Sequence, residues 1–535
     1  MKNFTTYLLL FITIQFSSAQ FYGPNDFRIS DAGGFGSTAT EVDFPDLAYN
    51  ITSQNYLVVW DSDDTDQTGG VVNNNNQIIG RFTDLNGNIQ GNDILISSLN
   101  LGNNQRRNLH PRITFNTADN NYLVVYQGDF NSNKTEAYGV IVNQDGTINT
   151  TDFRISFTAA NEDGRSPAIA YNPNLNEYLA IFISRIFSTS TTPARVEITG
   201  QRISNTGVLL GNAFDITNST TAGAQTNGSI PDIIFNPLSN DYVVTYVASP
   251  ITNEEEAYAT IVSQTGVIGN TVRLSNRGAI GNSGFANKSV RAAHSNIDNS
   301  YLFVYEADNS TQGEYDVFGV IYDATMNLLV PEFEISQVGG SDTRLDAVAP
   351  HVEWLPSDNM FYVVFQANPF FSDRNEREIF MRSVSSTGTV GANLLRVSEA
   401  PVAAAGSATQ PRIVSNGDGA LLTVYKAEDT STQSMMVNGE FEIYGQFYGT
   451  ATFNETEQEL TAVNVYPNPA LNEIYITGLD HVFSLSIYDA IGKQVFKKKN
   501  HSIDQSISIT DFSTGLYFIE IEMPERKEVI KFIKE

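Results

Sequence analysis

The sequence has no cysteine and only five histidines and two tryptophans among its 535 residues. Without cysteine the chain forms neither disulfides nor thiolate metal sites. No pair of histidines stands at the spacing of a zinc motif, and no Gly-x-Ser-x-Gly nucleophile elbow is present. These absences exclude the common thiol, zinc and serine-hydrolase chemistries, so the motifs predict no catalytic and no metal-binding residues.

Positive charge is also scarce, with 31 Lys and Arg against 60 Asp and Glu and a net charge of −29. This balance disfavours nucleic acid and anionic membranes as partners. One acidic stretch, Asp61–Asp66, has carboxylates at calcium-like spacing, but it lacks the glycine and the final glutamate of an EF-hand loop. We therefore expect an acidic surface loop and no cofactor, with calcium as a weak alternative.

Long hydrophobic runs are missing as well. The apolar stretch Tyr7–Ile14 is too short to span a bilayer, and no other run is long enough. Lys2 precedes it and Ser17–Gln20 follows it, which is the order of a secretory signal peptide. The sequence thus predicts a signal peptide over residues 1–20, export from the cytoplasm and no transmembrane segment.

The sequence does contain a repeat. A β-type run that opens with proline begins at Pro45 and returns at intervals of 56–66 residues. Its later copies begin at Pro111, Pro167, Pro231, Val290, Pro350 and Pro411. Each copy is followed by a run that is apolar on both faces, such as Asn55–Trp60, and then by two runs joined through a glycine turn, such as Asn86-Gly87. Seven repeats of four strands predict an all-β fold, a seven-bladed β-propeller.

The seventh repeat lacks its fourth run. That run has the form Phe-Arg-Ile-Ser at Phe153–Ser156, and the same form stands near the N-terminus at Phe27–Ser30. Pairing an N-terminal strand into the last blade closes the ring without an open sheet edge. An open β-solenoid is the alternative, but it gives the N-terminal fragment no reason to match the fourth run. We therefore expect a closed propeller over residues 21–450, followed by a linker over 451–461.

Residues 462–535 do not follow the repeat. Their alternating apolar and polar runs between Gly and Asn-Pro turns predict a small antiparallel β-sandwich. The tail also carries a series of motif residues: Tyr466, Pro467, Asn468, Pro469, Gly492, Lys493, Gly515, Tyr517 and Lys531. In this order they resemble the type A C-terminal sorting domain of the type IX secretion system of Bacteroidetes bacteria.

This resemblance implies Sec export to the periplasm, contact with the type IX secretion machinery and passage through the outer membrane. In that family the tail is usually cleaved, and the protein is released or attached to surface lipopolysaccharide. The resemblance therefore implies a secreted or cell-surface protein. It implies nothing about the activity of the propeller, whose repeats resemble uncharacterised repeats of secreted bacterial proteins.

The loops that lead into the first strand of each repeat, and those between the second and third strands, are long and share one face of a propeller, so we expect binding on that face. The residue after each opening proline starts the inner strand there. Six of these seven residues are ionisable in an otherwise apolar strand, the exception being Ala168. They are Asp46, Arg112, Asp232, Arg291, His351 and Arg412. We expect these six to bind an anionic or sugar ligand. The alternative is a set of mutually satisfied ion pairs and waters in a wet channel.

We therefore expect a non-enzymatic, exported module that binds a glycan or a protein. One alternative is a polysaccharide-active enzyme, a glycosidase or lyase, in which channel carboxylates act as acid and base. Asp46, Asp232 and Glu353 are its only candidates on the inner strands. A structural surface protein is the other alternative. The binding and enzyme hypotheses separate on whether the three carboxyl groups share an open pocket.

Overall fold

The computed structural model describes most of the chain. The described residues are 20–32, 40, 42–63, 75–103, 106–131, 134–188, 194–218, 231–249, 254–275, 277, 287–309, 312–338, 345–368, 377–398, 407–428, 440–449, 464–477, 483–490, 492–501, 506–522 and 527–535. Residues 1–19 of the predicted signal peptide and the whole predicted linker lie outside them. The chain divides into two compact units, Met1–Ala451 and Thr452–Glu535.

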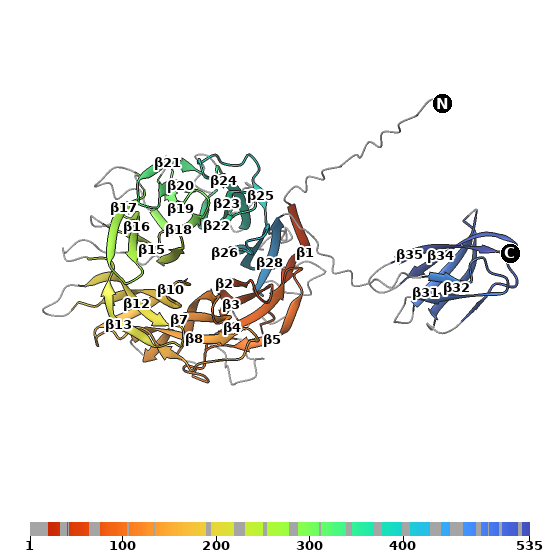
Figure 1. Cartoon of the computed structure of the whole chain (residues 1–535), viewed down its shortest axis with the longest axis horizontal. Helices are drawn as coiled ribbons and strands as arrows, with labels where there is room; N and C mark the ends of the chain where they lie inside the picture. The colour runs from red at the N-terminus through yellow and green to blue at the C-terminus, as the bar shows by residue number, and fades with distance from the viewer. Residues whose placement is uncertain are drawn as a thin grey trace, which may run out of the picture. The chain divides into compact units, whose positions relative to one another are not determined.

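The first unit consists of seven four-stranded antiparallel sheets, the blades, arranged around a common axis (Figure 1). The inner strands of blades 1 to 7 are β2 (Val42–Asn50), β6 (Asn108–Asn116), β10 (Glu162–Asn172), β14 (Asp232–Asn236), β18 (Asn287–Ser295), β22 (Ala347–Leu355) and β26 (Ala408–Ser415). The second strands are β3 (Asn55–Ser62), β7 (Asn121–Asn131), β11 (Glu177–Ile186), β15 (Asp241–Ala248), β19 (Ser300–Asp308), β23 (Met360–Ala367) and β27 (Ala420–Ala427).

The outer half of each blade follows the same order. The third strands are β4 (Gln77–Asp84), β8 (Lys134–Asn143), β12 (Arg195–Ser204), β16 (Glu256–Ser263), β20 (Tyr315–Asp323), β24 (Glu378–Ser385) and β28 (Glu442–Gly449). The fourth strands of blades 1 to 6 are β5 (Ile89–Leu95), β9 (Phe153–Arg154), β13 (Leu209–Asp215), β17 (Ile268–Arg273), β21 (Leu328–Glu334) and β25 (Leu395–Arg396).

The seventh blade takes its fourth strand from the other end of the chain. Strand β1 (Gln20–Arg28) pairs antiparallel with β28, in the sheet order β1-β28-β27-β26. Phe27 stands opposite Gly445 in this pairing, and its ring stacks on Phe447 with centroids 5.6 Å apart. The predicted seven-bladed propeller, closed by an N-terminal strand, is confirmed.

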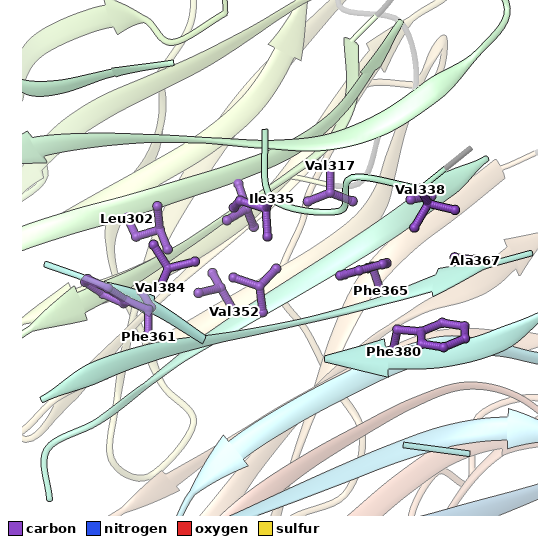
Figure 2. Packing of buried hydrophobic residues seen from close by; sticks show 14 of the residues in the cluster. Leu302, Val317, Ile335, Val338, Val352, Phe361, Phe365, Ala367, Phe380 and Val384 are labelled. Carbon is purple, nitrogen blue, oxygen red and sulfur yellow. The ribbon is translucent and has the colours of Figure 1, made fainter. Parts of the chain in front are cut away.

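Apolar cores lie between the blades. Seven clusters of buried side chains each join two neighbouring blades, and the last one joins blade 7 to blade 1. Figure 2 shows the interface of blades 5 and 6, where Leu302 and Val317 of blade 5 pack near Phe361 and Phe365 of blade 6. Every side chain of β3 is buried, as expected of a strand that is covered on both faces.

The fourth-run motif has a structural role that the sequence left open. Its Ser156 hydroxyl accepts a hydrogen bond from the Ala137 amide of β8 at 2.8 Å and donates one to Glu136, which Arg154 also binds. A Ser or Thr accepts the equivalent amide in all seven blades, from Ile78, Ala137, Ile198, Ala257, Val317, Ile379 and Ile443. The motif therefore links the fourth run to the third strand of the blade by hydrogen bonds.

The second unit is a small sandwich of two sheets with one apolar core between them. One sheet contains β29 (Asn464–Tyr466), β30 (Glu473–Thr477) and β33 (Ile507–Ser508). The other contains β32 (Gln494–His501), β31 (Phe483–Asp489), β34 (Gly515–Glu522) and β35 (Lys527–Lys534). The predicted C-terminal β-sandwich is confirmed.

Phe27→Ala tests the closure of the ring. Phe27 is 7% exposed and packs over Gly445, so its removal leaves a cavity in the closing sheet. We expect a loss of about 3–5 kcal/mol in the free energy of unfolding, measured by urea unfolding followed by circular dichroism. The exposed Ile51 serves as the control, and Ile51→Ala should change stability by no more than about 0.5 kcal/mol. Equal stability of the two variants would contradict the closing role of β1.

Candidate binding cavity on the propeller axis

A β-bulge places the candidate residues on the axis. In six inner strands the residue just before the opening proline of the repeat (Val290 in blade 5) has a positive φ, between 46° and 58°. The register of pairing with the second strand shifts at this residue. In β2 this residue is Phe44, and the register shifts between Asp43 and Asp46. The corresponding residue of blade 4 lies outside the described residues. A bulge bends its strand and redirects the next side chain, so Asp46 and its counterparts begin a new register directed to the channel.

The bulges are held by polar side chains of the preceding blade. The amide of His110 donates to Asp61 Oδ2 at 3.0 Å, and the amide of Ala349 donates to Glu306 at 2.6 Å. Gln127 and Gln366 accept the corresponding amides of the next blades. These bonds explain why a polar residue follows the apolar run within the second strand.

Asp61 is therefore a buried structural acceptor, although it opens the stretch with calcium-like spacing. Asp64 and Asp66 of that stretch lie outside the described residues. Across the described ranges, no group of three or more His, Asp or Glu side chains is arranged to hold a metal ion.

The six candidate residues are called here the polar ring, and five of them line one cavity of about 510 Å³, the channel cavity. Asp46, Arg112, Asp232, His351 and Arg412 line it. The sixth, Arg291, forms an ion pair with Asp232, with 3.6 Å between its Nε and Asp232 Oδ2. The sequence thus predicted a set of residues that the fold brings together from six different blades.

Contacts within the polar ring run between neighbouring blades. Asp46 accepts the Ile113 amide of blade 2 at 3.1 Å and lies 3.8 Å from Arg412 Nε of blade 7. His351 Nδ1 accepts the Ile413 amide at 3.3 Å. Arg112 is 5% exposed, and its Nη1 donates to the Pro111 carbonyl at 3.0 Å. Its Nη2 has no hydrogen-bond partner among the residues that the structure describes.

Electrostatics give the polar ring an excess of positive charge. Burial, reinforced by three nearby arginines, lowers the pKa of His351 well below its usual value, so its imidazole is neutral. Burial also raises the pKa of Asp46, against the pull of Arg112 and Arg412. It lowers the pKa of Arg412, but a guanidinium keeps its proton in proteins. Even with both aspartates ionised, three guanidinium groups outnumber two carboxylates.

Glu353 is a third carboxyl group in the channel cavity, two residues beyond His351 on β22. Burial raises its pKa to about 8, against the hydrogen bond that it receives from the Ser415 amide. It is therefore protonated at neutral pH. The three carboxyl groups of the enzyme hypothesis do share one cavity, but two of them are engaged by arginine.

Sequence reasoning missed four aromatic side chains that also line the channel cavity. These residues, the aromatic collar, are Tyr49, Phe115, Tyr171 and Phe235. Each packs against a tyrosine of the second strand of its own blade, with ring centroids 4.9–5.3 Å apart. Their signal was present in the repeat, since an aromatic residue stands four positions after the opening proline in blades 1 to 4.

The channel cavity extends from the polar ring to Asn416 and Gly417 in the short loop after β26. Asn416 accepts the Ala420 amide at 3.0 Å, which closes that loop tightly. The long loops, where we expected binding, are partly outside the described residues, and none of their described residues lines this cavity.

The motif residues of the C-terminal unit hold its sandwich together. Asn468 accepts the Ile533 amide at 2.9 Å and donates to the Lys531 carbonyl at 3.3 Å. Tyr466 stacks on Tyr475 of β30 with centroids 5.4 Å apart. The opening motif is thus bonded to the last strand of the chain.

The remaining motif residues shape two other parts of the sandwich. Gly492 has a φ of 84° in the turn before β32, where the Lys493 amide donates to Asp489 at 2.9 Å. Gly515 begins β34, and Tyr517 stacks on Phe532 with centroids 5.5 Å apart.

Residues 464–535 match the family model of the secretion system C-terminal sorting domain. The C-terminal unit is a type IX secretion sorting domain. A sorting domain of this kind implies interaction with the type IX secretion machinery, and it indicates secretion or attachment to the cell surface. Within the described ranges, no helix has the length and apolar character that a membrane crossing requires.

Solved structures similar to this chain include a protein of unknown function from Dyadobacter fermentans, with 11% identity, a TM-score of 0.44, and coverage of 80% of this chain and 99% of that one. A Penicillium chrysogenum α-L-arabinanase has 8% identity, a TM-score of 0.38, and coverage of 81% and 99%. A Fusarium graminearum GH93 α-L-arabinofuranosidase has 12% identity, a TM-score of 0.39, and coverage of 66% and 96%. At these values no likeness bears on the activity of this chain. No curated protein sequence matches it.

The raised pKa of Glu353 predicts a pH-dependent stability. Its folded pKa of about 8 exceeds the ordinary value of 4.5, so the folded state binds a proton more tightly than the unfolded state. The protonated Glu353 therefore contributes to the free energy of unfolding at low pH, and this contribution is lost as the pH rises from about 4.5 to about 8. We expect Glu353→Gln to raise the melting temperature at pH 8.5 by about 2 °C or more, and to leave it nearly unchanged at pH 5.

Differential scanning calorimetry across this pH range measures the effect. Glu177→Gln is the control, because Glu177 pairs with Arg202 near the surface of blade 3. Burial also raises the pKa of Glu378 and of Glu442 to about 7, so the variant should remove only part of the pH dependence. Parallel curves for the wild type and Glu353→Gln would contradict a protonated Glu353.

Proposed function

We propose that this protein is an exported module that binds a glycan in the channel cavity of its propeller, outside the cell or on its surface. The observation that supports this most strongly is the meeting of the polar ring and the aromatic collar on one cavity of about 510 Å³. Ligand pockets typically measure about 300–1,000 Å³ and combine apolar walls with a few polar groups. Aromatic faces and hydrogen-bonding side chains together are suited to a sugar.

Binding is favoured over catalysis by the state of the carboxyl groups. Asp46 is engaged by the Ile113 amide and by Arg412, and Asp232 is paired with Arg291. Carboxylate oxygens that already contact an amide or a guanidinium are less available to reach a substrate. The polysaccharide-active enzyme remains the second candidate, because the raised pKa of Glu353 would suit a general acid.

A glycan array followed by polysaccharide depletion tests the proposal. We expect saturable binding without product, and a loss of about tenfold or more in affinity in Arg112→Ala and in Arg412→Ala. Arg202→Ala is the matched control, since Arg202 of the third strand of blade 3 pairs with Glu177 of the second strand, away from the channel cavity. Thermal melts of each variant confirm folding. Shortening of the polymer would instead favour the enzyme, and Glu353→Gln should then abolish it.

The sorting domain predicts where the chain goes. Deletion of residues 464–535 should leave the propeller in the periplasm of a bacterium that carries a type IX secretion system, because the secretion machinery loses the domain that it recognises. Fractionation and immunoblotting measure the distribution. Undiminished export of the truncated chain would show that the sorting domain is dispensable.

A further inference from the structure

The charge balance of the polar ring singles out one class of glycan. Among the side chains of the polar ring, three guanidinium groups outnumber two carboxylates, and the imidazole is neutral. Arg291 has both Asp232 and, from outside the polar ring, Glu306 as nearby acids. Several other arginines of the propeller pair with a buried acid, as Arg273 does with Glu256. A buried charge is costly unless it is paired and hydrogen-bonded. Positive charge is in excess beside Asp46, because the guanidinium groups of Arg112 and Arg412 both act on this one carboxyl group.

Arg112 has a hydrogen-bond donor that no described residue satisfies. Its side chain lines the channel cavity, and the residue is 5% exposed. Its Nη1 donates a hydrogen bond to the Pro111 carbonyl. Its Nη2 has no hydrogen-bond acceptor in the described part of the chain. A buried donor without an acceptor carries the full cost of its desolvation. An oxyanion placed at Nη2 would satisfy the donor and would bring a negative charge beside Arg112.

The rest of the channel cavity fits a sugar ring rather than a free ion. Its walls beyond the polar ring include the aromatic collar of Tyr49, Phe115, Tyr171 and Phe235. An inorganic anion would make no apolar contact with these aromatic faces. A hydrocarbon acid would make no hydrogen bond to the polar groups of Thr114 and Ser415.

We propose that the channel cavity binds a sugar carrying one acidic group, a carboxylate or a sulfate ester, with the acidic group at Arg112 Nη2 and the sugar ring on the aromatic collar. This inference rests on the proposed function and specifies its ligand. A uronic acid residue and a sulfated hexose share the required chemistry, a single negative charge on oxygen next to a pyranose ring.

Isothermal titration calorimetry on the full chain tests this with small probes. The charged probes are D-galacturonate and D-galactose 6-sulfate, and the neutral ones are methyl D-galacturonate and D-galactose. We expect one or both charged sugars to bind at least about tenfold more tightly than their neutral partners. This comparison needs no variant. Whichever charged sugar binds identifies the source of the anion.

A variant then locates the site. Arg112→Gln should remove the preference for the charged sugar. Arg202→Gln should keep it, because it changes a pair between the second and third strands of blade 3, away from the channel cavity. If Arg112→Gln fails to fold, Phe115→Ala should weaken binding of the charged and the neutral sugar by the same factor, because Phe115 contacts only the sugar ring in this arrangement.

Three results would overturn the inference. Equal affinity for charged and neutral sugars would reject the acidic group and leave glycan binding intact. Inorganic sulfate binding as tightly as either charged sugar would reduce the channel cavity to an anion site. No binding of any sugar, with no hit on the glycan array, would reject the inference together with the proposed function.

Discussion

Closure of the ring is the constraint on which the rest of this structure depends. Strand β1 completes the seventh blade, so each blade has a neighbour on both sides and an apolar core at each interface. Closure also fixes the distance of the inner strands from the axis. The polar-ring residues of six blades are thereby brought close together around one small cavity. The chemistry of the channel cavity is a consequence of this geometry.

Within that space, the same backbone device recurs with different side chains. A bulge recurs at the opening position in each described case, whether the residue after that position is Asp46, Arg112 or the small Ala168. The bulge thus forms whichever side chain occupies the position after the opening residue. Four strands per blade and the serine bonds of the fourth run keep the scaffold constant, which leaves the axial position free to carry function.

Much of this was readable in the sequence, and the reason is the repeat. Seven copies of an opening run, each with an apolar second run, specify the blades, and the displaced Phe27–Ser30 specifies the closure. The same alignment of copies yielded the polar ring. The bulge was not predictable, because nothing in the side chains of Phe44 or Ala349 favours a positive φ. It depends on an acceptor from the preceding blade.

Two further features could not be predicted from the sequence: the end of the propeller toward which the channel cavity extends, and the protonation state of Glu353. The long loops suggested binding on their own face, whereas the cavity reaches a short loop at Asn416. Glu353 has an unremarkable place in its strand, and its raised pKa follows from burial at the axis with little more than the Ser415 amide as a partner. Such effects depend on neighbours distant in sequence, which local patterns do not encode.

The most direct measurement is a crystal structure of the full chain soaked with D-galacturonate. The account predicts electron density for the sugar in the channel cavity, with a carboxylate oxygen about 3 Å from Arg112 Nη2 and the pyranose ring against the aromatic collar. Density for the sugar on the long-loop face, with only water beside Arg112, would contradict it.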